Sequence, residues 1–251
     1  APPAITVRVC DSIACELAGA HDLLPRLPSL LGANVRVLNA SFGGGAFAQS
    51  FQDSVGALNA SGILFVAAAG NIDNGTREPN NDLVPHFPAN FNAPNIISVA
   101  ATNSIDAVSS FSHFGGTTVD LGAPGEGILS TTPPCSAPGP LCDPDFGSGI
   151  QDTYTFFSGT SMAAPHVSGA AALLWAQNPN LTVAQVKNLL VYNGQVQSSL
   201  LDKSLSGRRL HVGNAFTSLQ EADAVAPGTV TNLHIDAQTG RAITLSWNAA
   251  G

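Results

Sequence analysis

The sequence predicts an α/β fold in which a mostly parallel sheet is covered by helices on both faces. Short apolar runs alternate along the chain with segments of helical period, an order typical of this class. Residues 63–69 are apolar throughout, as expected for a central parallel strand that is buried on both faces. Residues 161–176 are small and apolar nearly all round, which predicts a helix in the middle of the domain.

The first elements predict a strand-helix-strand unit. Residues 5–10 and 35–39 alternate apolar and polar side chains, as strands do. A helix is expected over residues 46–59, because apolar side chains recur there at helical spacing: Phe47, Phe51, Val55 and Leu58. The pair Ser61-Gly62 ends this helix before the apolar strand begins.

The second half of the domain continues the pattern. Further strands are expected at residues 96–101, 119–121 and 128–131, which are separated by turn residues. Thr182, followed three residues later by Gln185, makes a capping box for an amphipathic helix that ends at Gly194. We expect the apolar face of that helix to consist of Val183, Val186, Leu189 and Leu190.

The chain changes character after about residue 220. Residues 221–228 predict a linker, and residues 229–251 contain strand-like alternation. The entry Pro227-Gly-Thr-Val-Thr-Asn-Leu233, followed by Leu245-Ser-Trp247, resembles the opening of a fibronectin type III domain. Such a sandwich needs about 100 residues, so we expect only its first strands here.

Composition excludes several classes of protein. The 251 residues carry a formal net charge of −8, which disfavours nucleic-acid binding. The apolar fraction of 44% disfavours disorder over the whole length. The longest apolar stretches fall far below the roughly 18 to 20 residues that cross a bilayer, so no membrane span is expected. The chain opens with Ala1-Pro2-Pro3, and we expect that it begins mid-protein rather than after a removed signal.

The four cysteines favour an extracellular location. Cys10 and Cys15 are close in sequence, as are Cys135 and Cys142, and neither spacing resembles a zinc knuckle. Two local disulfides are the simplest of the three pairings, and disulfides persist in oxidising compartments. The alternative is four inert thiols.

Three segments together indicate chemistry: residues 37–45, 66–71 and 157–167. Two of them follow predicted strands, where ligands collect in open α/β sheets. The third opens a helix with Ser161, and a free helical amide there suits an oxyanion. Taken singly, Ser161 reads as a helix cap, Asn71 as a turn residue and Gly43 as part of a tight loop.

The combination resembles the subtilisin-like serine proteases. Their nucleophile motif, Gly-Thr-Ser-Met-Ala-Ala-Pro-His, is present without a mismatch at residues 159–166, and the resemblance extends over roughly residues 1–217 of the predicted domain 1–220. It implies that Ser161 is the nucleophile of a serine endopeptidase and that Asn71 donates its amide to the oxyanion. It also implies that protein or peptide substrates lie between two backbone walls: Ser41, Phe42 and Gly43, and Ala68, Ala69 and Gly70.

The family's other two catalytic groups have no counterpart in this sequence. The aspartate of an Asp-Ser/Thr-Gly motif and the histidine of a His-Gly-Thr-His motif are both absent. A serine without a histidine base is a weak nucleophile, so we expect this chain alone to be inactive and its precursor's upstream part to supply both groups. His166 lies about 140° around the helix and roughly 7.5 Å along it from Ser161, out of reach. We expect it to be buried and structural.

The other histidines have no expected catalytic role. In the family, Phe87-Pro88 lies where the substrate pocket closes, with His86 beside it, and we interpret His86 as a surface residue. The remaining ones, which we expect to be solvated or hydrogen-bonded locally, are His21, His113, His211 and His234.

Two other interpretations of function stay open. One is a non-catalytic relative that keeps the cleft to bind extended peptides. The other is an α/β-hydrolase esterase that uses Asp202 and His211, which is disfavoured because Ala163 replaces the last glycine of the nucleophile elbow. The sequence assigns no cofactor; the resemblance implies calcium as an option, but no acidic ligand loop is recognisable in the sequence. The Asn-x-Ser/Thr sites that glycosylation would use are Asn39, Asn59, Asn74 and Asn180.

Overall fold

The computed structural model describes residues 7–8, 35–44, 46–72, 78–131, 154–222, 231–239 and 242–248. The chain divides into two compact units, Ala1–Ala215 and Phe216–Gly251. All four cysteines lie outside the described residues, so the expected disulfides stay a prediction.

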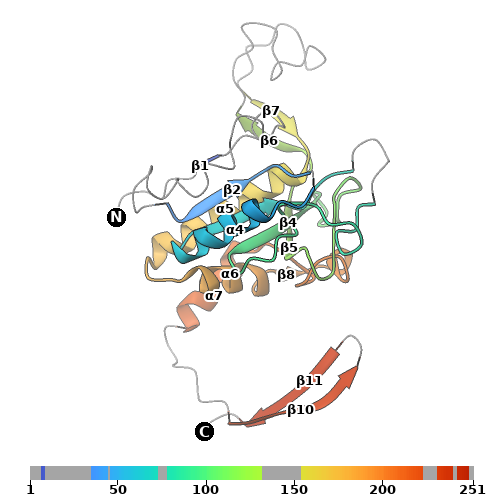
Figure 1. Ribbon diagram of the computed structural model, residues 1–251. Helices are drawn as coiled ribbons and strands as arrows, with labels where there is room; N and C mark the ends of the chain where they lie inside the picture. The colour runs from blue at the N-terminus through green and yellow to red at the C-terminus, as the bar shows by residue number, and fades with distance from the viewer. Residues whose placement is uncertain are drawn as a thin grey trace, which may run out of the picture. The chain divides into compact units, whose positions relative to one another are not determined.

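The first unit is built on a seven-stranded, mostly parallel sheet, which confirms the predicted fold class (Figure 1). Neighbouring strands pair in parallel from β1 to β5 and from β5 to β9, whereas β8 pairs with β9 in antiparallel fashion. In spatial order the strands are β1 (Val7–Arg8), β2 (Val37–Ala40), β3 (Leu64–Ala68), β4 (Ile96–Thr102), β5 (Leu121–Pro124), β9 (Arg208–Arg209) and β8 (Gln195–Val196).

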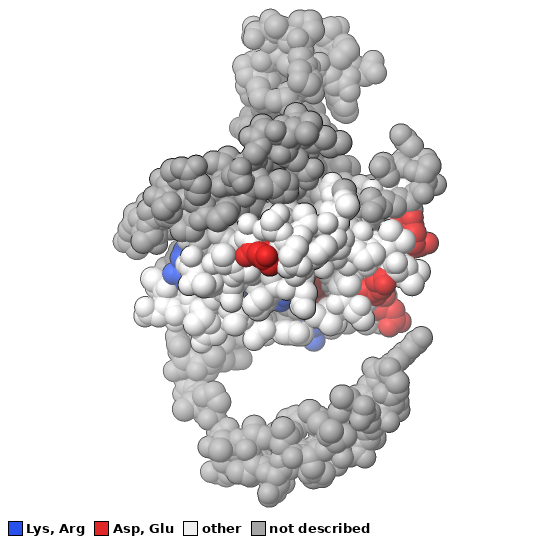
Figure 2. Space-filling view, in the orientation of Figure 1, with Lys and Arg blue, Asp and Glu red and all other residues white. Residues whose placement is uncertain are grey.

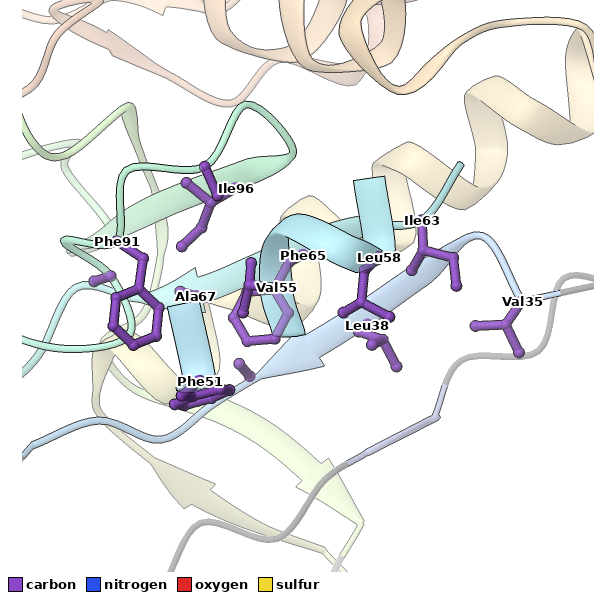
Figure 3. Packing of buried hydrophobic residues seen from close by; sticks show 13 residues of the cluster. Val35, Leu38, Phe51, Val55, Leu58, Ile63, Phe65, Ala67, Phe91 and Ile96 are labelled. Carbon is purple, nitrogen blue, oxygen red and sulfur yellow. The ribbon is translucent and has the colours of Figure 1, made fainter. Parts of the chain in front are cut away.

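One face of the sheet is covered by α4 (Gln49–Ala60), the predicted first helix. Its buried residues pack on Phe65 of β3 and on Phe91 in a core cluster (Figure 3). The ring centroid of Phe51 lies 5.1 Å from that of Phe91 and 6.3 Å from that of Phe65, both edge to face. Aromatic pairs at these separations add to the energy of burial.

Phe47 corrects the prediction for this helix, which begins two residues after it. The side chain is 48% exposed, and its ring packs edge to face on Phe87 and on Phe91 at the border of the core. The helix therefore begins at Gln49, later in the sequence than the apolar spacing predicted.

The opposite face is covered by α5 (Thr160–Gln177), which packs against β2, β3, β4 and β5. Strand residues alternate between the two faces, so Phe65 and Ala67 face α4, whereas Val66 faces the other side. The small side chains of α5 let the helix approach the sheet closely, and most of its residues from Ala163 to Trp175 are buried. The prediction of a central helix is confirmed, but the helix is not buried all round, because His166, Gly169 and Leu173 are exposed.

The next helix, α6 (Val183–Tyr192), begins at the predicted capping box. The Thr182 hydroxyl accepts a hydrogen bond from the amide of Gln185 at 3.2 Å, and the Thr182 amide donates to the Gln185 side chain at 2.8 Å. Both bonds satisfy amides at the helix start that have no helical partner.

Several other features differ from the sequence prediction, including the short strands β8 and β9, which were not predicted. β5 starts at Leu121, where the predicted strand ended, and the helix α7 (Val212–Ala222) was not predicted. A ribbon forms because β6 (Ile128–Thr131), which was predicted, pairs with the unpredicted β7 (Tyr154–Phe157). In the second unit, β10 (Thr231–Thr239) and β11 (Ala242–Asn248) pair as an antiparallel hairpin.

Charged side chains are sparse on the surface. Figure 2 shows them as isolated spots on the described part of one face, without a basic patch. Within the described residues no helix is long and apolar enough to span a bilayer. The same part of the chain holds no group of three or more His, Cys, Asp or Glu side chains that could bind a metal ion, so the calcium expected from the resemblance has no assigned site.

Candidate active site

The three segments singled out in the sequence converge at one edge of the sheet. Residues 41–44 follow β2 and residues 69–72 follow β3, and these two strands are parallel neighbours. The start of α5 meets both segments, because Ser161 bonds to Ser41 and Thr160 bonds to Asn71. Their convergence places Ser161 and Asn71 on the same side of the molecule.

Ser161 is tied to the first segment by two reciprocal hydrogen bonds. Its hydroxyl donates to the carbonyl oxygen of Ser41 at 3.0 Å, and the Ser41 hydroxyl donates to the carbonyl oxygen of Ser161 at 2.7 Å. Gly159, not Ser161, is the N-cap residue of α5, so the explanation of Ser161 as a helix cap is wrong. As the second residue of the helix, Ser161 has a backbone amide without an intrahelical partner.

Asn39 and Ser168 hold the Ser41 hydroxyl in place through a chain of hydrogen bonds, and neither was predicted as a site residue. The Asn39 side-chain amide donates to the Ser41 hydroxyl at 2.8 Å, and the Ser168 hydroxyl donates to the Asn39 side-chain oxygen at 2.9 Å. Asn39 is 3% exposed and Ser168 is 1% exposed. A polar residue in the otherwise apolar strand β2 was the one sequence signal for this network.

Asn71 is held in one orientation by Thr160. The Asn71 side-chain oxygen accepts hydrogen bonds from the backbone amide of Thr160 at 2.9 Å and from its hydroxyl at 3.2 Å. A backbone amide only donates, so the carboxamide atom that faces it must be the oxygen. The Asn71 nitrogen therefore points away from Thr160, and the residue is exposed.

Thr160 also fixes the second wall. Its hydroxyl accepts a hydrogen bond from the backbone amide of Gly70 at 3.1 Å, and Thr160 itself is fully buried. One buried side chain thus connects the start of α5, the end of β3 and the carboxamide of Asn71. The sequence placed Thr160 in the motif but gave it no role.

The walls differ in how their side chains are used. Phe42 is partly buried and packs against the core, where its ring stacks on that of Phe51 with the centroids 6.4 Å apart. Ala68 and Ala69 are buried. Gly43 is exposed, and Gly44 donates its amide to the carbonyl oxygen of Phe87 at 2.8 Å, which anchors the first wall.

Three histidines contradict the sequence prediction. His86, expected at the surface, is only 7% exposed and lies against Gly43 and Gly70. His166, expected to be buried, is exposed, because its place on α5 faces solvent and its ring nitrogen Nδ1 lies 2.9 Å from the carbonyl oxygen of Met162. His113 is completely buried and bonds to Asn81, 32 positions away, rather than to a sequence neighbour.

Comparison with known proteins identifies the family of this chain. The subtilase family model matches residues 15–219. The chain belongs to the subtilase family. It is 36% identical to subtilisin DY from Bacillus licheniformis over 154 residues, which cover 61% of this chain and 47% of that protein.

Other subtilases give a similar result. Alkaline elastase YaB from a Bacillus strain is 35% identical over 156 residues, 62% of this chain and 34% of that protein. A solved structure of a protease from Pseudoalteromonas arctica matches with a TM-score of 0.60 and 26% identity, over 74% of this chain and 51% of that one. This subtilase chain therefore spans about half the length, or less, of the relatives that it matches.

Proposed function

We propose that this subtilase chain carries the nucleophile, the oxyanion donors and the substrate cleft of a serine endopeptidase. The observation that carries the proposal is the junction at Thr160, which holds Asn71 with its amide nitrogen turned outward beside the start of α5. Ser161, the next residue, offers a hydroxyl and a helical amide at the same corner. A nucleophile next to two fixed N–H donors is the arrangement that acyl transfer requires.

In the proposed reaction, the Ser161 oxygen attacks a peptide carbonyl carbon while a base takes the hydroxyl proton. The carbonyl oxygen becomes an oxyanion that the Ser161 amide and the Asn71 side-chain nitrogen stabilise. The proton then passes to the leaving amine as the C–N bond breaks, and water releases the acyl group by the same steps in reverse order. The peptide would lie extended between residues 41–43 and 68–70, bonded to their backbone.

We propose that the base does not come from the described residues. In the described part of the chain, the Ser161 hydroxyl donates to the carbonyl oxygen of Ser41, which cannot take up its proton. His166 is exposed on the same helix and is out of reach of Ser161. We therefore propose that a histidine and an aspartate come from an upstream part of the precursor, in an extracellular protein whose C-terminal hairpin opens a fibronectin type III domain.

Peptide hydrolysis by this chain and by its full precursor tests the proposal. We expect turnover by the precursor, its loss in Ser161→Ala, and negligible turnover by residues 1–251 alone. Hydrolysis by the short chain that Ser161→Ala abolishes would show that a base is present within it. Hydrolysis by the precursor that survives Ser161→Ala would overturn the assignment of the nucleophile.

A non-catalytic peptide-binding role is the second candidate. It is favoured by the reciprocal bonds between Ser41 and Ser161, which leave the hydroxyl engaged with a carbonyl group. This role predicts a precursor that binds extended peptides but does not cleave them, with the aspartate or the histidine replaced in its upstream sequence.

A further inference from the structure

The ring of His86 lies between the two glycines that face each other across the proposed cleft. A Cβ atom built on Gly43 would lie 2.5 Å from Nε2 of His86 and 2.8 Å from its Cδ2. A Cβ atom built on Gly70 would lie 2.9 Å from each of the same two ring atoms. One edge of one imidazole therefore touches both walls and occupies the space where side chains of either wall would be.

A second imidazole backs the first. His113 packs on His86 with ring centroids 4.9 Å apart and ring planes at 73°. Its Nδ1 would lie 2.7 Å from a Cβ on Gly70, and its backbone amide donates to the carbonyl oxygen of Gly70 at 2.9 Å. The His86 ring thus has His113 behind it and cannot move deeper without displacing that residue.

Asn81 fixes the position and the tautomer of His113. Its side-chain nitrogen donates to the carbonyl oxygen of Ala69 at 2.9 Å, which leaves its oxygen facing His113 Nδ1 at 3.0 Å. Since that oxygen only accepts, Nδ1 of His113 carries a proton. The second wall, Asn81 and His113 therefore form one bonded unit under Gly70.

The backbone of His86 is anchored as firmly as its ring. Its amide donates to the Asn90 side-chain oxygen at 2.9 Å, and the Asn90 side-chain nitrogen donates to the carbonyl oxygen of Asn81 at 2.9 Å. The next residue, Phe87, accepts a bond from the first wall at Gly44. Both ends of the contact are held, so the ring is a fixed floor between the walls.

We propose that His86 determines specificity by limiting the depth of the cleft, so that it accepts a short side chain and rejects a large aromatic one. This inference rests on the proposed function of residues 41–43 and 68–70 as substrate walls. A substrate side chain that enters between Gly43 and Gly70 meets the His86 edge, because the same ring atoms contact both glycines. His86 acts by its volume and touches substrate directly.

Binding of two matched peptides to the full chain tests this inference. The probes are fluorescent tetrapeptides that differ only in the last residue, alanine or phenylalanine. We expect wild type to bind the alanine peptide more tightly, and His86→Ala to shift the ratio of dissociation constants at least tenfold towards the phenylalanine peptide. The same shift is expected in the ratio of kcat/KM values for the precursor.

Two further variants separate volume from folding. His86→Gln keeps most of the side-chain volume, and we expect it to retain the preference for alanine. His166→Ala removes an exposed histidine outside the walls, and we expect it to leave both dissociation constants unchanged.

The outcomes distinguish this inference from the proposed function. Two outcomes would overturn the role of His86 but not the proposed cleft. One is tighter binding of the phenylalanine peptide to wild type, and the other is an equal loss of affinity for both peptides in folded His86→Ala. Binding of neither peptide to wild type or to any folded variant would overturn both the inference and the proposed cleft.

Discussion

The side-chain oxygen of Asn71 accepts hydrogen bonds from both the backbone amide and the hydroxyl of Thr160. The first bond anchors the carboxamide to the start of α5, and the second connects it to Gly70 through the same hydroxyl. The direction of the Asn71 nitrogen is therefore set by a buried threonine and not by Asn71 itself. Such preorganisation lets an oxyanion be bound without reorientation at the moment of reaction.

Thr160→Val tests this dependence. The change removes a bond to Asn71 and leaves the buried amide of Gly70 without its acceptor, which costs about 1 to 3 kcal/mol of stability. In the proposed precursor we expect a fall in kcat, with KM little changed, because Asn71, the proposed oxyanion donor, is no longer fixed. Thr160→Ser retains the hydroxyl and should keep most of the activity; equal losses in both variants would contradict the argument.

Removing the Asn71 side chain, the proposed oxyanion donor, sets an upper limit for the fall in kcat that Thr160→Val can cause. We expect Asn71→Ala to lower kcat of the precursor by about 10²- to 10³-fold, a value known from the equivalent donor in this family. The free energy of unfolding should also fall by about 1 to 3 kcal/mol, because the change leaves the buried backbone amide of Thr160 without its acceptor. A rise in KM with kcat unchanged would show that Asn71 binds the substrate and the transition state equally, and does not stabilise the oxyanion in particular.

Ser41→Ala should affect stability, although Ser41 is only partly buried. The Ser41 hydroxyl accepts from Asn39 and donates to the carbonyl oxygen of Ser161, so its loss strands the buried Asn39 amide. We expect the free energy of unfolding in urea to fall by about 1 to 3 kcal/mol. Ser50→Ala, at an exposed position in α4, serves as the control and should change it by less than about 0.5 kcal/mol.

Glycine is required at Gly70 but not at Gly56. Gly70 has a φ of +117°, and a Cβ there would lie 2.7 Å from the buried ring of His113, so we expect Gly70→Ala to lose at least about 2 kcal/mol. Gly56 lies within α4 with open space around its missing Cβ, and Gly56→Ala should gain about 0.5 to 1 kcal/mol. Chemical denaturation of both variants provides the comparison.

The sequence was sufficient for the elements whose signals are local. The apolar run of β3, the small residues of α5 and the capping box of Thr182 and Gln185 all depend on a few neighbouring positions. The resemblance to family motifs also predicted that Ser161 and Asn71 belong to one site, without any knowledge of their contacts. These features were predictable because periodicity, capping and motif residues are read within one segment.

The histidines were not predictable, because their environment depends on distant segments. His86 lies against Gly43 and Gly70, which precede it in the sequence by 43 and 16 positions, respectively. His166 lies in a motif dominated by buried residues, yet the rotation of α5 points it to solvent. Similarly, β7 exists only because it pairs with β6 across a long connection.

An ion pair between the partly buried Lys187 and the buried Asp120 predicts a dependence of stability on pH. The charged atoms are 3.0 Å apart, and burial raises the pKa of Asp120 although Lys187 opposes that shift. In Lys187→Met the carboxyl loses its partner, and we expect a loss of about 3 to 5 kcal/mol at neutral pH. The folded state then favours protonated Asp120 more strongly, so the loss should shrink as the pH falls towards about 4.

Unfolding in urea at neutral pH and near pH 4.5 measures this effect. Lys203→Met, which removes a lysine outside the ion pair, should show a small loss that is the same at both pH values. A loss for Lys187→Met that grows on acidification would contradict the predicted sign.

Asp82 should show the opposite dependence on pH. Burial tends to raise the pKa of Asp82, but hydrogen bonds from Thr118, Thr117 and the Gly116 amide outweigh it and hold the pKa below its usual value. A depressed pKa in the folded state contributes stability above the unfolded value of about 3.9, and that contribution is lost as the pH falls through the folded pKa. We expect Asp82→Asn to be less stable than wild type at neutral pH and to converge with it in strong acid.

Thr118→Val should move the titration of Asp82, followed by NMR, to higher pH. Asp53→Asn, on the exposed face of α4, should leave the titration of Asp82 in place. An Asp82 titration that Thr118→Val leaves unmoved would show that the hydroxyl does not stabilise the carboxylate.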